Sequence, residues 1–338
     1  VYKDQEEFTS GRATIEQLVE KLDGPLDADA FADKGVYDVL VIGGGPAGNS
    51  AAIYAARKGL KTGLLAETFG GQVIETVGIE NMIGTLYTEG PKLMAQVEEH
   101  TKSYDVDIIK SQLATGIEKK ELIEVTLANG AVLKSKTAIL ALGAKWRNIN
   151  VPGEEEFRNK GVTYCPHCDG PLFEGKNVAV IGGGNSGLEA ALDLAGITKH
   201  VTVLEFLPEL KADQVLQERA AKTDNLTILK NVATKEIVGQ DYVTGLNYVE
   251  RDTNEEKHLD LEGVFVQIGL VPSTAWLKDS GIELNERQEI IVDKFGSTNI
   301  PGIFAAGDCT DSAYKQIIIS MGSGATAAIG AFDYLIRQ

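Results

Sequence analysis

The chain has 338 residues, of which 43% are hydrophobic and 24% charged, and its formal net charge is −17. This length exceeds what one hydrophobic core usually organises, so we expect two globular domains. The negative charge repels polyanions, which argues against nucleic acid or an anionic membrane surface as a partner. Three cysteines are too few for a secreted disulfide scaffold, and no signal segment opens the sequence. We therefore predict a folded cytoplasmic protein.

The first 35 residues form a stretch of their own. Apolar residues at helical spacing over residues 15–22 predict a small helix after a short strand-like start, and residues 24–35 are an acidic, small-residue linker. We expect residues 1–35 to be the end of an upstream domain with its linker. The alternative is an N-terminal arm that folds onto the body of the protein.

Two units of strand, glycine turn and helix follow. Residues 37–42 form a buried-strand run that ends in the turn 43–48 (Gly-Gly-Gly-Pro-Ala-Gly), and residues 178–181 lead into the turn 182–187 (Gly-Gly-Gly-Asn-Ser-Gly). Both turns continue into Ala-rich helices. Two such units predict an α/β protein with two Rossmann-like, three-layer nucleotide-binding domains.

Each turn is suited to a dinucleotide. The first glycine permits the tight bend, the second lets a pyrophosphate approach the backbone, and the third lets helix and strand pack closely. The phosphates are then expected at the helix N-terminus, where unpaired N–H groups and the helix dipole favour negative charge. The turn residues expected at a cofactor are Gly43, Gly45, Pro46, Ala47 and Gly48 in the first unit and Gly182, Gly184, Asn185, Ser186 and Gly187 in the second.

An acidic residue follows the second strand of each unit. Glu67 comes after residues 62–66 and Glu205 after residues 201–204. A carboxylate at this place accepts hydrogen bonds from the adenosine ribose and repels a 2′-phosphate. Glu205 therefore indicates NADH rather than NADPH, more so because Phe206 follows instead of a basic cluster. The alternative is that each glutamate is only a solvated strand end.

Cys165 and Cys168 are separated by two residues, which in a protein with nucleotide-binding domains indicates redox chemistry. A zinc site needs about four ligands, and no second cysteine pair exists, so no metal is expected. Cys309 is expected to be a small buried residue. Asp169 is a candidate general acid, with a helix N-cap as the competing role. His167 either tunes a thiol pKa or is a spacer.

Residues 317–336 are apolar and about as long as a membrane-spanning helix. Ser320, Ser323, Thr326 and Asp333, together with three glycines, interrupt that stretch. Small and polar residues of this kind suit close packing inside an α/β domain. We predict a packed helix and no membrane span.

Together these features resemble the bacterial flavoprotein disulfide reductases, which include low-molecular-weight thioredoxin reductases and the flavoprotein subunit of alkyl hydroperoxide reductase. The match runs from about residue 36 to the C-terminus. The hydroperoxide reductase branch is the closer one, because residues 144–148 and 165–173 follow its pattern and residues 205–207 replace the His-Arg-Arg run of the NADPH-dependent branch. The segments that carry the resemblance are residues 43–48, 70–72, 80–81, 165–170, 182–187, 307–308 and 314–318.

The resemblance implies FAD and NADH as cofactors and assigns further residues to them. Gly269 joins the NADH set. Cys168 matches the thiol nearest the flavin C4a, and Cys165 matches the interchange thiol that attacks the partner disulfide. The implied FAD contacts beyond the first turn and Glu67 are Gly71, Gln72, Asn81, Gly143, Gly307, Asp308, Lys315, Gln316 and Ile317.

The resemblance also implies a discontinuous FAD domain, residues 36–146 and 275–338, with an NADH domain, residues 147–274, inserted and carrying the cysteine pair. A hydride would pass from NADH to FAD, and the electrons would then open the disulfide while Asp169 protonates the departing thiolate. By analogy, the domains rotate about segments near Ala144 and Pro272.

The implied acceptors are an N-terminal thioredoxin-like domain and then a peroxiredoxin, which reduces alkyl hydroperoxides and hydrogen peroxide. A homodimer is implied as well. Two other enzymes stay open at this point: a thioredoxin reductase-like enzyme with a free-standing thioredoxin, and an NADH oxidase that forms hydrogen peroxide. A nucleotide-binding module without turnover is the third alternative.

Overall fold

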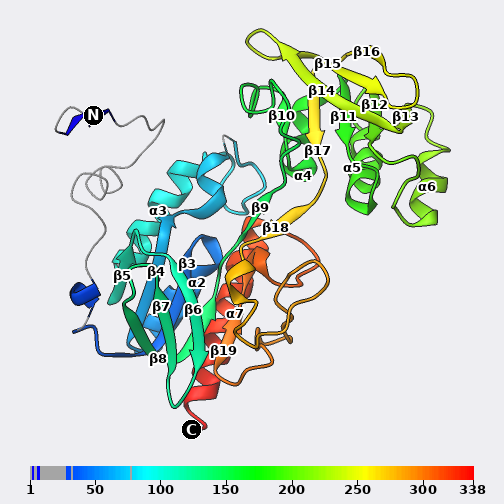
Figure 1. Ribbon diagram of the computed structural model, residues 1–338. Helices are drawn as coiled ribbons and strands as arrows, with labels where there is room; N and C mark the ends of the chain where they lie inside the picture. The colour runs from blue at the N-terminus through cyan, green and yellow to red at the C-terminus, as the bar shows by residue number, and fades with distance from the viewer. Residues whose placement is uncertain (1, 4–5, 8–27, 32, 77) are drawn as a thin grey trace.

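The protein is described by a computed structural model that covers residues 2–3, 6–7, 28–31, 33–76 and 78–338. Within those residues the chain forms two α/β domains, one above the other in Figure 1. Two short strands pair near the start, β1 (Tyr2–Lys3) and β2 (Glu6–Glu7). The helix predicted at residues 15–22 lies outside the described residues.

The first domain is built on a seven-stranded sheet. Five of its strands run parallel, and the hairpin of β6 and β7 continues the sheet antiparallel. In sheet order the strands are β5 (Val106–Lys110), β4 (Thr62–Phe69), β3 (Val36–Gly44), β8 (Val132–Leu140), β7 (Ile123–Leu127) and β6 (Ala114–Lys119), with β19 (Ile303–Ala305) also paired to β8.

β8 has three partner strands in this sheet. β3 lies along one edge, while β7 and β19 share the other. β7 pairs with the first half of β8, residues 132–135, and β19 pairs with its end, residues 138–140. The C-terminal part of the chain therefore completes a sheet that the N-terminal part begins.

Helices α2 and α7 cover one side of this sheet. They pack on each other through small residues, and Ala47, Ala51, Ala327 and Ala328 are buried between them and the strands. α7 is the one helix among the described residues that is long and apolar enough to cross a membrane. The helical elements of the first domain are η1 (Ala28–Phe31), α2 (Pro46–Arg57), η2 (Gly71–Glu75), α3 (Gly90–Lys102), η4 (Ala275–Leu277), η5 (Gly307–Cys309) and α7 (Ile317–Leu335).

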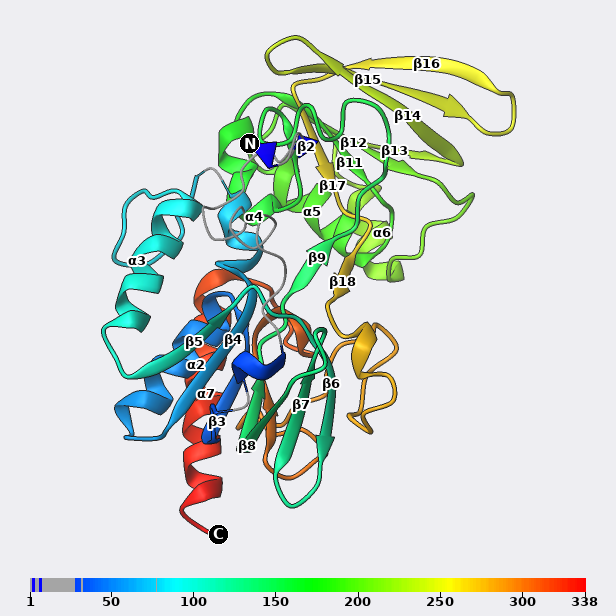
Figure 2. The same cartoon turned by 60° about the vertical axis from the view of Figure 1, so that its left-hand side comes forward.

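The second domain has a parallel five-stranded sheet between two covering layers. α5 and α6 lie on one face, and a three-stranded antiparallel sheet, at the top of Figure 2, lies on the other. The parallel strands, in sheet order, are β10 (Val162–Thr163), β17 (Gly263–Val266), β11 (Asn177–Ile181), β12 (His200–Glu205) and β13 (Leu226–Lys230). The other elements of this domain are α4 (Pro166–Asp169), η3 (Gly170–Phe173), α5 (Asn185–Ala195), α6 (Gln214–Ala220), β14 (Val232–Gly239), β15 (Val243–Glu250) and β16 (Glu255–Asp260).

Two short strands connect the domains. β9 (Ala144–Trp146) leaves the first domain and β18 (Leu270–Pro272) returns to it, and the two pair antiparallel. The first sheet thus takes strands from both sides of the second in sequence. This confirms the predicted fold class, a discontinuous first domain with the second inserted. The predicted hinge residues, Ala144 and Pro272, face each other in this ribbon.

Glu67 lies inside a strand, whereas the sequence predicted it after the strand. β4 extends to Phe69, because it continues alongside the glycine turn at Gly44. The prediction of a packed helix at the C-terminus has a structural basis in the small residues of α7. A Cβ at Gly324 would lie 2.1 Å from the Ala47 carbonyl oxygen, so the helix approaches α2 at a distance that only glycine permits.

Candidate functional site

The first glycine turn connects β3 to α2. Gly43 has φ 120°, and a Cβ there would lie 2.1 Å from the Ala141 carbonyl oxygen. A Cβ at Gly48 would lie 1.7 Å from the Gly43 carbonyl oxygen, so both positions require glycine. At Gly45 a Cβ would meet no atom of the described residues within 4 Å. The turn is therefore closed on the protein side and open at the N-terminus of α2, where a phosphate would bind.

Asn49 braces this turn. Its side chain is fully buried, and its Nδ2 donates to the carbonyl oxygens of Gly44 at 2.8 Å and Gly45 at 3.0 Å. Thr101 of α3 donates in turn to Asn49 Oδ1 at 2.8 Å. Sequence reasoning missed this residue, because an asparagine one position beyond the turn carries no signal of its own.

The second turn, between β11 and α5, repeats the same geometry. Gly182 has φ 114°, and a Cβ there would lie 2.5 Å from the Gln267 carbonyl oxygen. A Cβ at Gly187 would lie 1.9 Å from the Gly182 carbonyl oxygen, while one at Gly184 would meet no described atom within 4 Å. Each domain thus presents one open helix N-terminus of the kind that binds a pyrophosphate.

Glu205 ends β12 and braces the second turn. Its side chain is 8% exposed, and it accepts hydrogen bonds from the backbone N–H groups of Gly183 and, at 2.7 Å, Leu207. A basic group approaches this corner from the turn that follows β15. The Arg251 guanidinium lies 3.8 Å from the ring centre of Phe206 and donates to the Phe206 carbonyl. Arg251 has no local sequence signal, because it is 45 residues away from Phe206.

The C-terminal segment of the first domain returns to the first turn. A Cβ at Gly307 would lie 2.9 Å from the Ala47 Cβ, which places η5 against the start of α2. Asp308 accepts a hydrogen bond from Ser320 at 2.9 Å. Burial raises the pKa of the Asp308 carboxyl, and the Ser320 hydrogen bond only partly opposes that effect. Burial removes the water molecules that would donate hydrogen bonds to this carboxyl, and the hydroxyl groups of a ligand could replace them.

The other residues that the resemblance assigns to the flavin lie beside the first turn or next to the start of α7. Gly71 lies beside the first turn, since its added Cβ would be 3.4 Å from the Gly45 Cα. Asn81 Nδ2 donates to Gln316 Oε1 at 3.1 Å, and Gln316 directly precedes α7, whose first residue is Ile317. Lys315 is engaged within the protein, because its Nζ pairs with the Glu289 carboxylate at 2.9 Å.

Three implied cofactor residues lie near the connection between the domains. Gly143 and Gly269 have φ 69° and 102°, and a Cβ at either would meet no described atom within 4 Å. The Gln72 amide lies between the Ala144 carbonyl oxygen and the Trp146 Nε1, with its oxygen facing the indole N–H. η2 therefore touches the ribbon that joins the two domains.

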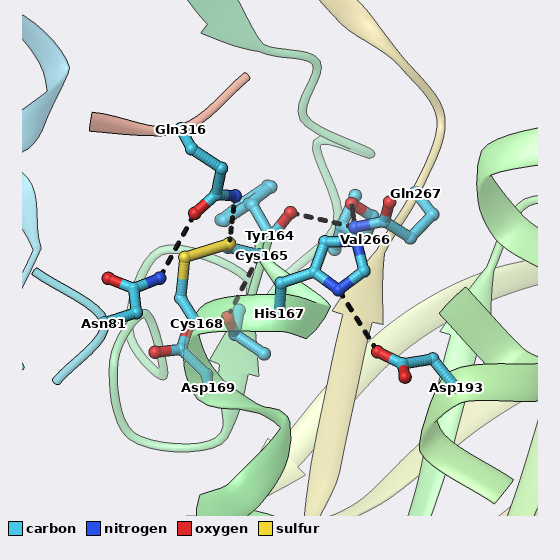
Figure 3. Close-up of a disulfide and its surroundings, with 11 residues drawn as sticks. Asn81, Tyr164, Cys165, His167, Cys168, Asp169, Asp193, Val266, Gln267 and Gln316 are labelled. Carbon is cyan, nitrogen blue, oxygen red and sulfur yellow. Dashed lines mark hydrogen bonds and ion pairs between the residues drawn. A yellow bond between two sulfur atoms is a disulfide. The ribbon is translucent and has the colours of Figure 1, made fainter. Parts of the chain in front are cut away.

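Cys165 and Cys168 form a disulfide at the start of α4 (Figure 3). Cys165 immediately precedes the helix, and both residues are half-buried. The Gln316 Nε2 lies 3.8 Å from the Cys165 Sγ. The redox pair of the second domain thus faces, in the first domain, the segment where the resemblance implies the flavin ring.

Asp169 lies next to the pair. Burial raises the pKa of its carboxyl, and a hydrogen bond donated by the Thr163 hydroxyl opposes that effect. Asp169 precedes η3 but makes no capping hydrogen bond to the described backbone there. A carboxyl that holds its proton more strongly than usual is suited to general acid catalysis.

Two other residues near the pair differ in orientation. His167 Nδ1 lies 3.2 Å from the Asp193 carboxylate of α5, and Figure 3 shows its ring pointing away from the sulfurs. Tyr164, which precedes Cys165, donates to the buried Glu154 at 2.9 Å and accepts a hydrogen bond on its carbonyl from Gln267. The backbone that carries the pair is therefore anchored inside the second domain.

Cys309 is fully buried in the core of the first domain, as predicted. Burial raises the pKa of its thiol to about 11, so it is inert as a nucleophile. In the described part of the chain, no group of three or more His, Cys, Asp or Glu side chains could hold a metal ion.

Comparison with known proteins decides the family. The model of the pyridine nucleotide-disulphide oxidoreductase family matches residues 37–324. The chain belongs to this family. It is an oxidoreductase, and the resemblance to the bacterial flavoprotein disulfide reductases is confirmed.

Curated relatives of this oxidoreductase are longer than the chain. It is 66% identical to a protein named NADH dehydrogenase from Bacillus subtilis (strain 168), over all of this chain and 66% of that protein. It is 58% identical to a protein from Staphylococcus aureus (strain Mu50 / ATCC 700699) that is named as a subunit of alkyl hydroperoxide reductase, over all of this chain and 67% of that protein. The chain thus spans about two thirds of the length of the curated relatives it matches.

Two solved thioredoxin reductases match the chain to different degrees. The Streptococcus pyogenes MGAS5005 enzyme is 36% identical with a TM-score of 0.85, over 90% of this chain and 99% of that chain. The Lactococcus lactis enzyme, titled as the FR conformation, is also 36% identical but has a TM-score of 0.61, over 89% and 100%. At equal identity, the enzyme titled as the FR conformation therefore superposes less well on this chain.

Proposed function

We propose that the chain is the core of an NADH-dependent, FAD-containing disulfide reductase of the alkyl hydroperoxide reductase type. The observation that carries this proposal is the 3.8 Å approach of Gln316 Nε2 to Cys165 Sγ. A disulfide belonging to the second domain lies against the candidate flavin segment of the first. Electrons delivered there have a disulfide within reach.

The first domain suits FAD. The turn is open at Gly45, the N-terminus of α2 favours the pyrophosphate, and Asp308 offers a buried acceptor for a hydroxyl. We propose boundaries near residues 36–146 and 275–338 for this domain. When bound, FAD would accept a hydride from the nicotinamide and supply an electron pair to the disulfide.

The second domain, proposed as residues 147–274, suits NADH. Each Glu205 oxygen already accepts one backbone N–H and keeps a second lone pair for a ribose hydroxyl. The carboxylate would repel the 2′-phosphate of NADPH. Gly184 leaves the N-terminus of α5 open for the pyrophosphate.

The protein's own part in the disulfide step is proton transfer. Opening the disulfide takes two electrons and yields two thiols once two protons arrive. Asp169, whose carboxyl pKa is raised by burial, would give one proton to the departing thiolate, and the Thr163 hydroxyl donates a hydrogen bond to this carboxyl. Cys165, after losing its proton, would then attack the disulfide of the acceptor and form a mixed disulfide. Cys168 would attack that bond in turn, so that the Cys165–Cys168 disulfide forms again and the acceptor leaves as a dithiol with both electrons and both protons.

For the acceptor we propose a thioredoxin-like domain and then a peroxiredoxin that reduces alkyl hydroperoxides and hydrogen peroxide in the cytoplasm. The name of the Staphylococcus aureus relative supports this choice. A homodimer is proposed too. It is supported by apolar side chains exposed on α2 and α7, among them Tyr54, Ile318 and Ile329, and sedimentation would test it.

The decisive experiment replaces both cysteines of the pair with serine in the FAD-loaded protein. Reduction of an artificial disulfide should be abolished, while NADH still bleaches the flavin. Cys309→Ala is the matched control, since this cysteine is buried away from the pair. A double variant that reduced the disulfide at the full rate would overturn the proposal.

A second candidate is direct NADH oxidation by oxygen, with formation of hydrogen peroxide. The name of the Bacillus subtilis relative favours it, because that name mentions NADH and no disulfide. Oxygen consumption that is unaffected by added disulfide acceptor, and equal in the double serine variant, would support this second function.

A further inference from the structure

η2 is a place where the first domain touches the second. Its Gln72 amide contacts β9, and its last residue, Glu75, contacts the loop that precedes β10. The Glu75 carbonyl accepts a hydrogen bond from Asn159 Nδ2 at 3.1 Å. The Glu75 carboxylate lies 3.8 Å from Arg158 Nη1. One residue of the first domain therefore meets two adjacent residues of the second.

Contacts within the second domain hold these two residues in place. Asn159 has φ 61°, a left-handed conformation that asparagine tolerates, and its N–H donates to the Val162 carbonyl at 3.0 Å. Arg158 is 20% exposed and donates to Glu155 at 2.9 Å. The loop presents both donors to Glu75 without having to reorganise.

The same loop leads to the redox pair. The Arg158 guanidinium lies 4.8 Å from the ring centre of Tyr164, the residue before Cys165. Tyr164 in turn stacks on Trp146 of the connecting ribbon, with ring centres 6.3 Å apart. A contact at Glu75 is thus linked by packed side chains to the position of Cys165.

We infer that Glu75, Arg158 and Asn159 form an interdomain latch, which holds the disulfide at the Gln316 segment and opens when the domains rearrange. The inference rests on the proposed function, in which the flavin accepts a hydride from the nicotinamide and then supplies an electron pair to the disulfide. The two thioredoxin reductases with equal identity and unequal TM-scores support the existence of two domain placements. The latch residues are positioning residues and touch no reacting atom.

The contacts of the latch are weak enough for the two domain placements to interchange. Glu75 is 62% exposed, so its ion pair with Arg158 is screened by water and salt. An exposed ion pair and one neutral hydrogen bond each shift an equilibrium by about two- to fivefold. Together they bias the domain placement without locking it.

The test measures domain placement directly, by single-molecule fluorescence energy transfer in the FAD-loaded protein. One dye is attached at exposed Lys92 of α3 and the other at exposed Val215 of α6, through non-natural amino acids so that the cysteines stay. Glu75→Gln and Asn159→Gly should each lower the population of the latched placement about two- to fivefold. Glycine at residue 159 keeps the left-handed backbone.

Glu155→Gln is the matched control. Glu155 contacts the same guanidinium from within the second domain, and a glutamine there loses the charge while its amide oxygen still accepts the Arg158 hydrogen bond. Arg158 should therefore stay in place, and the latched population should be unchanged. In stopped-flow experiments Glu75→Gln should speed flavin reduction by NADH about two- to fivefold, whereas Glu155→Gln should not. The charge swap Glu75→Arg with Arg158→Glu should restore the population lost in Arg158→Glu alone.

Equal energy-transfer distributions for Glu75→Gln, Asn159→Gly and the unmodified protein would overturn the latch. So would the same shift in Glu155→Gln, because the effect would then come from disorder of Arg158. The energy-transfer measurement needs neither NADH nor an acceptor. A failure of the latch is therefore distinguishable from a failure of disulfide reduction in the double serine variant.

Discussion

The two glycine turns have the same backbone and different braces. In both, a Cβ on the third glycine would collide with the carbonyl of the first, at 1.7 Å for Gly48 and 1.9 Å for Gly187. The first turn is held by Asn49, a neutral amide from its own helix. The second is held by Glu205, a carboxylate from the next strand.

This difference separates residues that only hold a turn in shape from residues that can also select the cofactor. Asn49 is buried and its hydrogen-bonding groups are used inside the protein, so it acts on the turn alone. Glu205 holds its turn and also keeps free lone pairs, which the proposed function assigns to a nucleotide. In the second domain, one carboxylate can therefore serve both the turn and the choice of cofactor.

The largest effect is expected from the third glycine of each turn. Gly48→Ala should yield protein without flavin, because the added Cβ displaces the turn proposed to bind FAD. Gly187→Ala should keep flavin but slow flavin reduction by NADH more than about 100-fold, because its Cβ displaces the turn proposed to bind NADH. Flavin absorbance and anaerobic NADH titration measure the two losses. Gly184→Ala sharpens the comparison, since its Cβ has space in the protein and should impair only nucleotide binding. Loss of flavin in Gly187→Ala would contradict the separation of the two sites.

The next effect concerns the buried carboxyl beside the disulfide. Asp169→Asn should slow disulfide reduction by about 100-fold or more, while flavin reduction by NADH is unchanged. In the unmodified protein the disulfide step should slow as pH rises through the raised pKa of Asp169, because the ionised carboxyl has no proton to give. Rapid-reaction pH profiles measure this, and an identical profile in Asp169→Asn would exclude the acid role.

The same substitution should alter stability with a definite sign. Burial raises the pKa of Asp169 in the folded state above that of the unfolded chain. The fold therefore loses stability as pH rises from the ordinary pKa of an aspartate to the raised one, and loses nothing in acid, where both states are protonated. Asp169→Asn should raise the unfolding temperature at neutral pH relative to the unmodified protein, and the gain should vanish in acid. Thermal unfolding at several pH values measures the difference.

A smaller effect is expected for nucleotide choice. Glu205→Arg should reduce the preference for NADH over NADPH by about tenfold or more, since a repulsive charge becomes an attractive one. Glu67→Gln, in the other domain, is the counterpart and should leave nucleotide preference unchanged, because Glu67 is exposed on β4. Ratios of kcat/KM for the two nucleotides measure both, and equal ratios in the unmodified protein would refute the role of Glu205.

The smallest effect is expected from the neutral brace. Asn49→Ala removes the side-chain hydrogen bonds to the Gly44 and Gly45 carbonyls and the one from the Thr101 hydroxyl, while each of these groups keeps a backbone partner. The loss should lower the free energy of unfolding by about 1–3 kcal/mol. Chemical denaturation measures the loss. NADH preference should not change, which distinguishes this brace from Glu205.

Local patterns predicted much of this molecule. Both turns, their strands and helices, the cysteine pair and the burial of Cys309 follow from residue types at short spacing. What was missed depends on contacts between distant segments. Asn159 reaches Glu75 from 84 residues away, and Arg251 reaches Phe206 from the turn that follows β15, so neither contact leaves a sequence pattern.

The pairing of β9 with β18 has a consequence for protein engineering. Trp146 and Leu270 face each other where the chain leaves and re-enters the first domain. A two-residue turn can join antiparallel strands at such a pair. Deleting everything between them and closing the gap with an Asn-Gly turn should give a continuous single-domain protein, in which the proposed flavin binding can be tested without the inserted domain.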